Sequence, residues 1–184
     1  MTNKFTGLLA GLTITFAAIL SSGTTAYAGP NTRPTQQIAA VTPLGMQYFC
    51  AQHRSECSAG GAAQVTMTQN LIGALRQVNS TVNRAIRPRR DSADIWQLNP
   101  RSGDCEDYVL SKRSALIHQG VPSGSLRIAY THTRGGTPHA VLIVRTTEGD
   151  YVLDNLNNSV KTLRASGYRI RTMSTANPKR WTAV

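Results

Sequence analysis

One cysteine of this chain is flanked by acidic residues, in the segment Gly103-Asp104-Cys105-Glu106-Asp107-Tyr108. Acids are scarce elsewhere, since the chain has 9 Asp and Glu residues against 20 Lys and Arg residues and a formal net charge of +11. A reactive thiol is normally activated by positive surroundings, which favour the thiolate. The acids therefore indicate one of two things: a bound cation beside a nucleophile, or an exposed helix start whose thiol does no chemistry.

A cysteine nucleophile needs a base and a group that orients the base. The candidate bases are His53, His118, His132 and His139. His118 would lie in the last turn of the helix that Cys105 begins, roughly 20 Å along the axis, which is too far. His139 begins the most apolar strand pattern, and Asp154 lies near the end of the next strand. From spacing alone, the alternatives remain a buried structural cysteine, a structural histidine and a turn aspartate.

The hairpin between these two strands decides whether His139 and Asp154 can meet. Side chains alternate between the two faces along a strand. The numbers 139 and 154 add up to an odd value, so both residues lie on one face in any hairpin in which the numbers of two paired residues also add up to an odd value. A two-residue turn at Glu148-Gly149 would set Asp154 opposite Ile143 and leave His139 about 13 Å away, at ~3.3 Å per residue. The pair therefore requires a β-bulge, strong strand coiling, or a turn nearer Thr146.

The surrounding pattern predicts an α+β fold, with helices first and an antiparallel sheet afterwards. An apolar stripe of helical spacing predicts a helix from Thr66 to the residues before Pro88. A second helix begins at Cys105 and stops at Gly120, while the region from Pro43 to Cys57 is expected to be loop and turn. The predicted strands are Leu126 to Tyr130, His139 to Val144, Tyr151 to Asp154 and, more weakly, Tyr168 to Thr172.

The first residues have the pattern of a secretory signal peptide. Lys4 supplies a positive charge, Gly7 to Leu20 is apolar, and Ala26-Tyr27-Ala28 fits a cleavage site. We therefore expect residues 1–28 to be a signal peptide and the mature protein to be periplasmic or secreted. Residues 29–42 are expected to form a flexible N-terminal arm, and residues 43–184 one domain. No later segment is long and apolar enough to span a membrane.

Two of the three cysteines lie close together in the sequence. An oxidising export compartment favours a disulfide between Cys50 and Cys57. His53 raises the alternative of a zinc site, but Cys-x2-His-x3-Cys supplies only three ligands, and structural zinc sites use four. The disulfide is therefore the prediction, and it leaves Cys105 as the free thiol.

The strong basic charge admits nucleic acid, anionic polymers or acidic proteins as partners. Only 6% of the residues are aromatic, so the chain offers no stacking platform for single-stranded nucleic acid. The basic residues are scattered apart from Arg87-Pro88-Arg89-Arg90. A solvated surface on an exported protein is the favoured interpretation, and no nucleic-acid partner is expected.

Several motifs resemble the bacterial transglutaminase-like cysteine proteinases, which include LapG-type periplasmic proteases. The resemblance spans about Phe49 to Trp181. It rests on the segment around Cys105 and on weaker motifs, which are Val78-Asn79-x2-Val82-Asn83, Asp94-x-Trp96, His139-Ala140-Val141-Leu142 and Val152-Leu153-Asp154-Asn155. It implies a papain-like or transglutaminase-like core, a nucleophile helix packed on an antiparallel sheet. It also implies that Cys105 is the nucleophile, His139 the base and Asp154 the orienting acid.

The same resemblance implies calcium as a cofactor, bound through Asp104, Glu106 and Asp107. It implies an envelope or surface protein, such as an adhesin, as the substrate, and an inner-membrane protein as a regulator. Trp96 or Asn99 is a candidate oxyanion donor beside a backbone N–H near Cys105. Three alternatives stay open: acids that only complement a helix dipole, a non-catalytic calcium-responsive binding module on this fold, and a basic envelope protein that binds anionic polymers.

Overall fold

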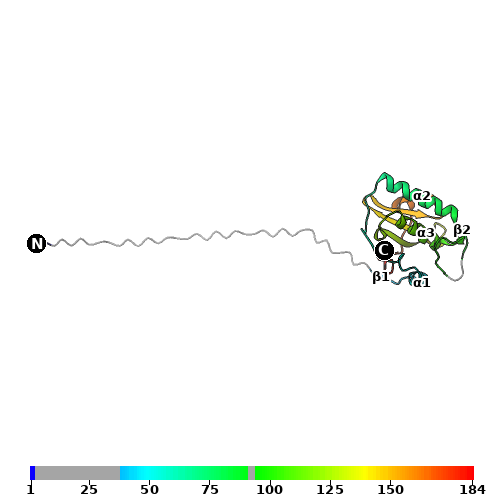
Figure 1. Cartoon of the computed structure of the whole chain (residues 1–184), viewed down its shortest axis with the longest axis horizontal. Helices are drawn as coiled ribbons and strands as arrows, with labels where there is room; N and C mark the ends of the chain where they lie inside the picture. The colour runs from blue at the N-terminus through cyan, green and yellow to red at the C-terminus, as the bar shows by residue number, and fades with distance from the viewer. Residues whose placement is uncertain (3–37, 91–93) are drawn as a thin grey trace. The chain divides into compact units, whose positions relative to one another are not determined.

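An antiparallel sheet organises the chain. The computed structural model describes residues 1–2, 38–90 and 94–184, and Gln36–Val184 form a compact unit (Figure 1). Within these described residues the sheet has seven strands in the order β1-β9-β8-β4-β5-β6-β7. Their bounds are β1 Ala39–Ala40, β4 Leu126–His132, β5 Pro138–Thr146, β6 Gly149–Asp154, β7 Asn157–Thr162, β8 Thr172–Ser174 and β9 Trp181–Ala183.

Helices and one short parallel pair complete the described part of the chain. The helices are α1 Leu44–Gln52, α2 Gln69–Ala85, α3 Cys105–His118, α4 Leu163–Ser166 and the 3-10 turn η1 Ser123–Ser125; β2 Arg87–Pro88 pairs with β3 Ser102–Gly103. Among the described helices, none is long and apolar enough to cross a bilayer. The α+β prediction is confirmed. The predicted signal peptide and most of the predicted arm lie outside the described residues.

Helices α2 and α3 pack together on one face of the sheet (Figure 1). Helix α2 begins where the Thr68 side chain accepts a hydrogen bond from the Leu71 N–H at 3.1 Å. Its apolar stripe buries Leu75, Val78 and Val82 against the core. The predicted stripe is thus confirmed, and it places the asparagines of α2 beside the end of β6.

Helix α3 starts at Cys105 because the preceding residues form a local cap. Asp104 and Asp107 form a capping box, in which each side chain accepts a hydrogen bond from the other residue's backbone N–H. A Cβ atom on Gly103 would overlap the Asp107 carboxylate, so only glycine fits before the cap. This geometry fixes the cysteine in the first helical position.

The other face of the sheet is covered by the chain between β7 and β8. Buried Ala129, Val141, Ile143 and Val152 contact side chains from that segment, which are Leu163, Tyr168, Ile170 and Met173. The predicted strand from Tyr168 to Thr172 is therefore wrong in its position. The strand here is Thr172–Ser174, and the preceding residues Tyr168 and Ile170 pack their side chains on the apolar face.

Two other predictions are corrected near the N-terminal end of the described residues. The region expected to be loop and turn contains helix α1, which buries Met46, Phe49 and Cys50. Residues Ala39 and Ala40 lie in the predicted flexible arm, yet they pair with β9. Tertiary contacts thus order segments whose local composition favoured irregular structure.

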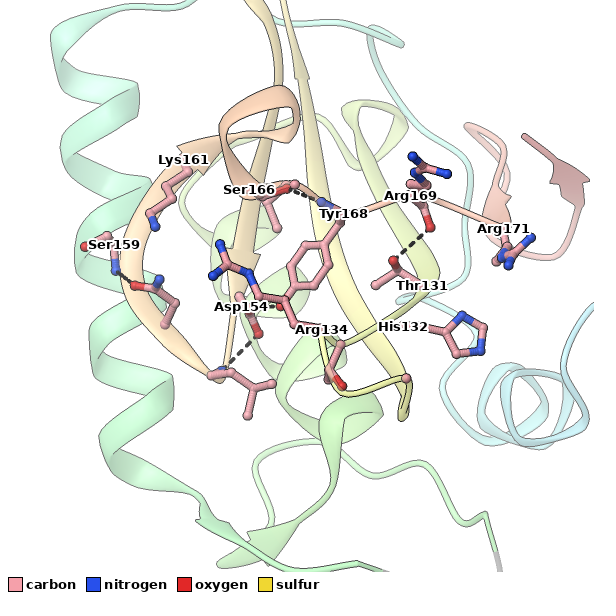
Figure 2. Close-up of a pocket in the computed structure, with 16 residues that line it drawn as sticks. Thr131, His132, Arg134, Asp154, Ser159, Lys161, Ser166, Tyr168, Arg169 and Arg171 are labelled. Atoms are coloured by element: carbon pink, nitrogen blue, oxygen red, sulfur yellow. Dashed lines mark hydrogen bonds between the residues drawn. The ribbon is translucent and has the colours of Figure 1, made fainter.

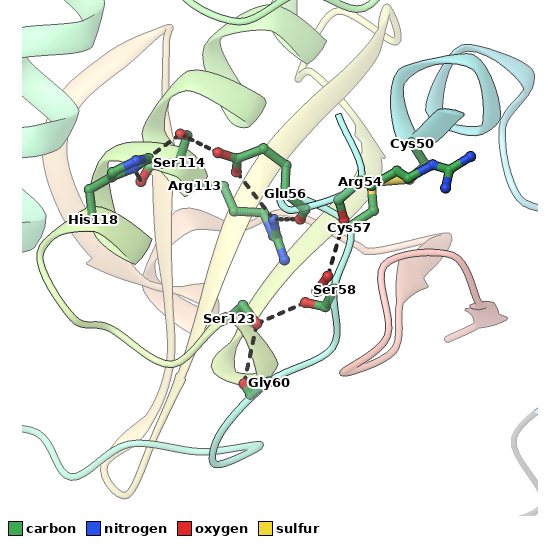
Figure 3. A network of polar contacts seen from close by, with 10 residues as sticks. All are labelled: Cys50, Arg54, Glu56, Cys57, Ser58, Gly60, Arg113, Ser114, His118 and Ser123. Carbon is green, nitrogen blue, oxygen red and sulfur yellow. Dashed lines mark hydrogen bonds and ion pairs between the residues drawn. A yellow bond between two sulfur atoms is a disulfide. The ribbon is translucent and has the colours of Figure 1, made fainter. Parts of the chain in front are cut away.

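A disulfide joins Cys50 to Cys57, as predicted, with an S–S distance of 2.11 Å. The loop it closes holds Glu56, whose backbone carbonyl accepts a hydrogen bond from buried Arg113 on α3 (Figure 3). The Glu56 carboxylate also accepts a hydrogen bond from Ser114 Oγ at 2.8 Å. Burial lowers the pKa of Arg113 to about 10, and Glu56 opposes that shift. The disulfide therefore braces the helix that carries Cys105.

Replacing both residues, as Cys50→Ser with Cys57→Ser, should lower the free energy of unfolding by about 2 kcal/mol, because closing a short loop gives a stabilisation at the low end of the usual range. Urea denaturation measures the change, and Cys105→Ser is the matched control that should leave stability nearly unaltered. Mass spectrometry of unreduced peptides should show the two cysteines linked. Equal stability of the double variant and the unaltered protein would contradict the bracing role.

Candidate active site

The side chains of His139 and Asp154 meet on the face of the sheet opposite α3. The hairpin pairs Thr146 with Gly149 and Leu142 with Leu153, so the two-residue turn lies at Thr147-Glu148. Continuing this register sets Asp154 opposite Val141. His139 is then a diagonal neighbour roughly 7 Å away along the strand, within reach of the two side chains. Of the three routes predicted to bring the pair together, the structure takes the turn nearer Thr146.

Asp154 and His139 are joined by a short buried contact. His139 Nε2 lies 2.8 Å from Asp154 Oδ1, and the residues are 4% and 6% exposed. An ionised carboxylate can only accept a hydrogen bond, so Nε2 carries the proton. The other ring nitrogen, Nδ1, is then left with a lone pair and can accept a proton.

Two further hydrogen bonds hold the Asp154 carboxylate. The Leu156 N–H donates to Oδ1 at 2.9 Å, and the Tyr168 hydroxyl donates to Oδ2 at 2.6 Å (Figure 2). Burial acts to raise the pKa of Asp154, but the hydrogen bonds from His139, Tyr168 and Leu156 outweigh it and the pKa is lowered. Burial and the Asp154 charge raise the pKa of Tyr168, which therefore stays a donor. The carboxylate is thus kept ionised and fixed in direction.

Asparagines of α2 secure the turn that follows Asp154. Asn83 Nδ2 donates to the Asp154 backbone carbonyl at 2.9 Å. Buried Asn79 Nδ2 donates to the carbonyls of Asn157 and Asn158 at 2.9 and 3.1 Å. In the sequence both asparagines stood out only as part of the motif Val78-Asn79-x2-Val82-Asn83. These contacts tie α2 to the backbone at Asp154 and in the turn after it.

Cys105 reaches the same end of the sheet from α3. Its thiol lies against the backbone N–H of Ala140, the residue that follows His139. The thiol donates a hydrogen bond to Glu106 Oε2 at 2.8 Å. Burial is the main cause that raises the pKa of Cys105, followed by the charge and hydrogen bond of Glu106 and the charge of Asp104. The acids thus oppose thiolate formation, as their number in the sequence predicted.

The three acids predicted to bind a metal have distinct contacts. Asp107, 3% exposed, accepts hydrogen bonds from the Gln97 N–H at 2.7 Å and the Asp104 N–H at 3.3 Å. Glu106 accepts hydrogen bonds from Cys105 and from the partly buried phenol of Tyr130. Among the described residues, no group of three His, Cys, Asp or Glu side chains is arranged to hold a metal ion. Their oxygens suit a hard cation, and an oxygen that accepts one hydrogen bond has a second lone pair.

The remaining candidates from the sequence lie elsewhere. His53 stacks on Phe49 with ring centroids 4.6 Å apart, and His118 Nδ1 lies 2.8 Å from the Ser114 carbonyl in its own helix. His132 is exposed at the end of β4. The Trp96 indole N–H donates to Asp94 Oδ1 at 2.9 Å, so this group is already engaged and does not support the suggested oxyanion role.

A buried lysine beside the site was missed by the sequence analysis. Lys112 is 1% exposed, and its Nζ lies 5.7 Å from the centroid of the Tyr108 ring. Burial lowers its pKa to about 7, and the negative charge of Asp154 opposes that shift. Lys112 lies two helical turns after Cys105 and so on the same face of α3. That spacing was visible in the sequence, but a lysine on an apolar face is normally exposed.

The chain is similar to a known protein family and to several solved structures. The family model described as bacterial transglutaminase-like cysteine proteinase matches residues 36–184. Calcium-bound LapG of Legionella pneumophila is 27% identical over 58% of this chain and 71% of that chain, with a TM-score of 0.51. A second LapG structure from this organism is 27% identical over 62% and 75% of the two chains, also with a TM-score of 0.51. An EGTA-treated LapG structure has 26% identity, 56% and 68% coverage and a TM-score of 0.46.

No curated protein matches the chain. The family match covers most of the chain, and the two neighbours with TM-scores of 0.51 support the same fold. The predicted transglutaminase-like fold and cysteine peptidase class are both confirmed. The chain belongs to the bacterial transglutaminase-like cysteine proteinase family.

Proposed function

We propose that this chain is an exported endopeptidase in which Cys105, His139 and Asp154 act as a catalytic triad. The observation that carries the proposal is the buried hydrogen bond between His139, at the start of β5, and Asp154, at the end of β6, with Cys105 beside Ala140. A structural histidine needs only a hydrogen-bond partner. Here the partner is an ionised acid, held by two more donors, and a free thiol lies next to the following residue.

The arrangement supports acyl transfer through a thioester. His139 Nδ1 takes the thiol proton as Cys105 Sγ attacks the peptide carbonyl, and the Asp154 carboxylate stabilises the imidazolium. The C–N bond then breaks, and His139 returns the proton to the leaving amine. Water, deprotonated by His139, hydrolyses the thioester and restores the thiol.

The export proposal rests on the pattern of residues 1–28 and on the disulfide, which is typical of oxidising compartments. The substrate would then be an envelope or surface protein. A surface adhesin is the candidate that the family resemblance implies, with an inner-membrane protein as the candidate regulator.

We also propose that activity requires calcium. Two things support this: a structural neighbour is named as calcium-bound, and three acids surround Cys105. Asp104, Glu106 and Asp107 would contribute oxygens, together with backbone carbonyls or water, since three carboxylates cannot supply the usual six to eight ligands. When bound, the ion would supply positive charge that offsets the acids around the thiol.

Cys105→Ser should keep the fold and lose at least about a thousandfold in kcat/KM, because serine at this position is a far weaker nucleophile. Activity against exported proteins, read as new N-termini, measures the effect, and circular dichroism checks the fold. Cleavage at close to the rate of the unaltered protein would exclude the thiol mechanism.

Tyr168→Phe should lower kcat/KM about tenfold, because removing a hydrogen bond to a charged group costs roughly 1.5–3 kcal/mol. The pKa of Asp154 is lowered in the folded protein, so its contribution to stability is present above the unfolded-state pKa and is lost as pH falls through the folded-state pKa. Without Tyr168 the folded-state pKa rises, so both the acid limb of kcat/KM and acid unfolding should move to higher pH.

The matched control for this change is Tyr48→Phe, on an exposed side chain of α1. It should leave the pH profile of kcat/KM and the acid unfolding midpoint in place. Identical pH profiles for the two variants would show that Tyr168 does not hold the triad acid.

EGTA should abolish activity, and calcium, but not magnesium, should restore it and raise the melting temperature, because magnesium requires a smaller octahedral site. Glu106→Gln should raise the calcium concentration needed for half-maximal activity by about tenfold or more. Glu148→Gln, an exposed acid in the β5–β6 turn, is the control and should not. Full activity and unchanged melting in EGTA would reject the calcium requirement and leave the triad proposal standing.

A further inference from the structure

A cavity of about 800 Å³ opens on the face of the sheet opposite α2 and α3. Val152, Asp154 and Tyr168 line its inner part, and its walls come from the loop 133–136, from β7 and from residues 166–171 (Figure 2). The volume lies within the range of ligand-binding pockets, roughly 300–1,000 Å³. The cavity is therefore large enough to hold several side chains of a bound partner.

Positive charge dominates this cavity. Its lining includes four exposed cations, which are Arg134, Lys161, Arg169 and Arg171. Figure 2 shows Tyr168 between Lys161 on one side and Arg169 and Arg171 on the other. Among the described residues, none of the four forms an ion pair with an acid of the chain. Four cations close together without paired acids repel one another, and the binding of an anionic partner would reduce that repulsion.

The acid that lines the cavity does not neutralise these cations. Asp154 is turned inward, and its two oxygens accept hydrogen bonds from His139, Leu156 and Tyr168. Arginine side chains bind carboxylates through two parallel hydrogen bonds, so three arginines and a lysine suit a segment that carries several carboxylates.

The cavity also lies next to the reacting groups. Asp154 lines it and contacts the base His139, and its loop 133–136 leads into the strand that begins at Pro138. A bound peptide extends about 3.3 Å per residue away from the cleaved bond. A few residues of chain therefore suffice to pass from Cys105 into the cavity.

We propose that this basic cavity binds acidic residues of the protein substrate on one side of the cleaved bond. The inference rests on the proposed peptidase function and names its substrate class. A nucleic acid fits less well, because the described lining residues include only two rings, His132 and Tyr168, and the Tyr168 hydroxyl is bound to Asp154, so there is no row of rings for base stacking.

A binding experiment tests the cavity without requiring cleavage. Cys105→Ser protein is titrated with a fluorescein-labelled glutamate-rich peptide and with its glutamine counterpart. The glutamate peptide should bind at least about tenfold more tightly, and Arg134→Glu with Lys161→Glu should remove that preference. The matched control reverses the charge of one arginine and one lysine outside the cavity, in the variant Arg76→Glu on α2 with Lys179→Glu after β8. This variant should retain most of the preference for the glutamate peptide.

Two binding results would overturn the proposal. Equal loss in both charge-reversal pairs would mean that the general positive field of the protein, and not the cavity, attracts the peptide. An oligodeoxynucleotide of equal charge that binds as tightly as the peptide, with its binding lost in Arg134→Glu/Lys161→Glu, would make the cavity a site for any polyanion.

Cleavage of a proteome-derived peptide library tests the same cavity through catalysis. Acidic residues should be enriched on one side of the cut sites. In Arg134→Glu/Lys161→Glu, kcat/KM should fall at least about tenfold for acid-flanked peptides and stay unchanged for neutral ones. Enrichment of apolar or basic residues in the unaltered protein would overturn the proposal. Absence of all cleavage would count against the peptidase function. The binding experiment would still decide whether the cavity binds acidic residues.

Discussion

The hydrogen bond between His139 and Asp154 is the contact on which the site depends, and its position follows from the register of one hairpin. Moving the turn one residue along the chain slides β6 by two residues relative to β5. Asp154 then stays on the same face but lies two positions further from His139. With the turn at Thr147-Glu148 they are diagonal neighbours and can touch at 2.8 Å. With the turn one residue later, the gap would be about 13 Å.

The two faces of the sheet have different roles in holding that contact. On one face, α2 fixes the turn after Asp154 through Asn79 and Asn83, and α3 brings Cys105 to Ala140. On the other face, the segment between β7 and β8 brings Tyr168 to the Asp154 carboxylate. Asp154 is thus held from both sides, and the segment that supplies Tyr168 also supplies Arg169 and Arg171, two of the cations that line the cavity.

The Cys105 thiol lies in surroundings that oppose its ionisation. The Cys105 thiol is partly buried and donates to Glu106, and both features raise its pKa. Asp104 and Asp107 are needed locally, because their capping box starts the helix. Asp104 therefore helps to start the helix while its charge raises the pKa of the thiol.

The amino-acid sequence by itself determined the features that depend on neighbours along the chain. The helix start at Cys105, the stripe of α2, the Cys50–Cys57 disulfide and the strands through His139 and Asp154 were all readable, because the interacting residues lie within a few turns or a short loop. The motif around Cys105 also indicated the family. Tertiary structure alone decided the hairpin register, the order in α1 and in the pairing of β1 with β9, the approach of Tyr168 to Asp154, the burial of Lys112 and the gathering of four cations in one cavity. The hairpin register is local, but two turns that differ by one residue fit the same sequence pattern, and packing of the two strands selects between them. The other features join segments far apart in sequence or depend on how the whole sheet is covered, which no local pattern specifies.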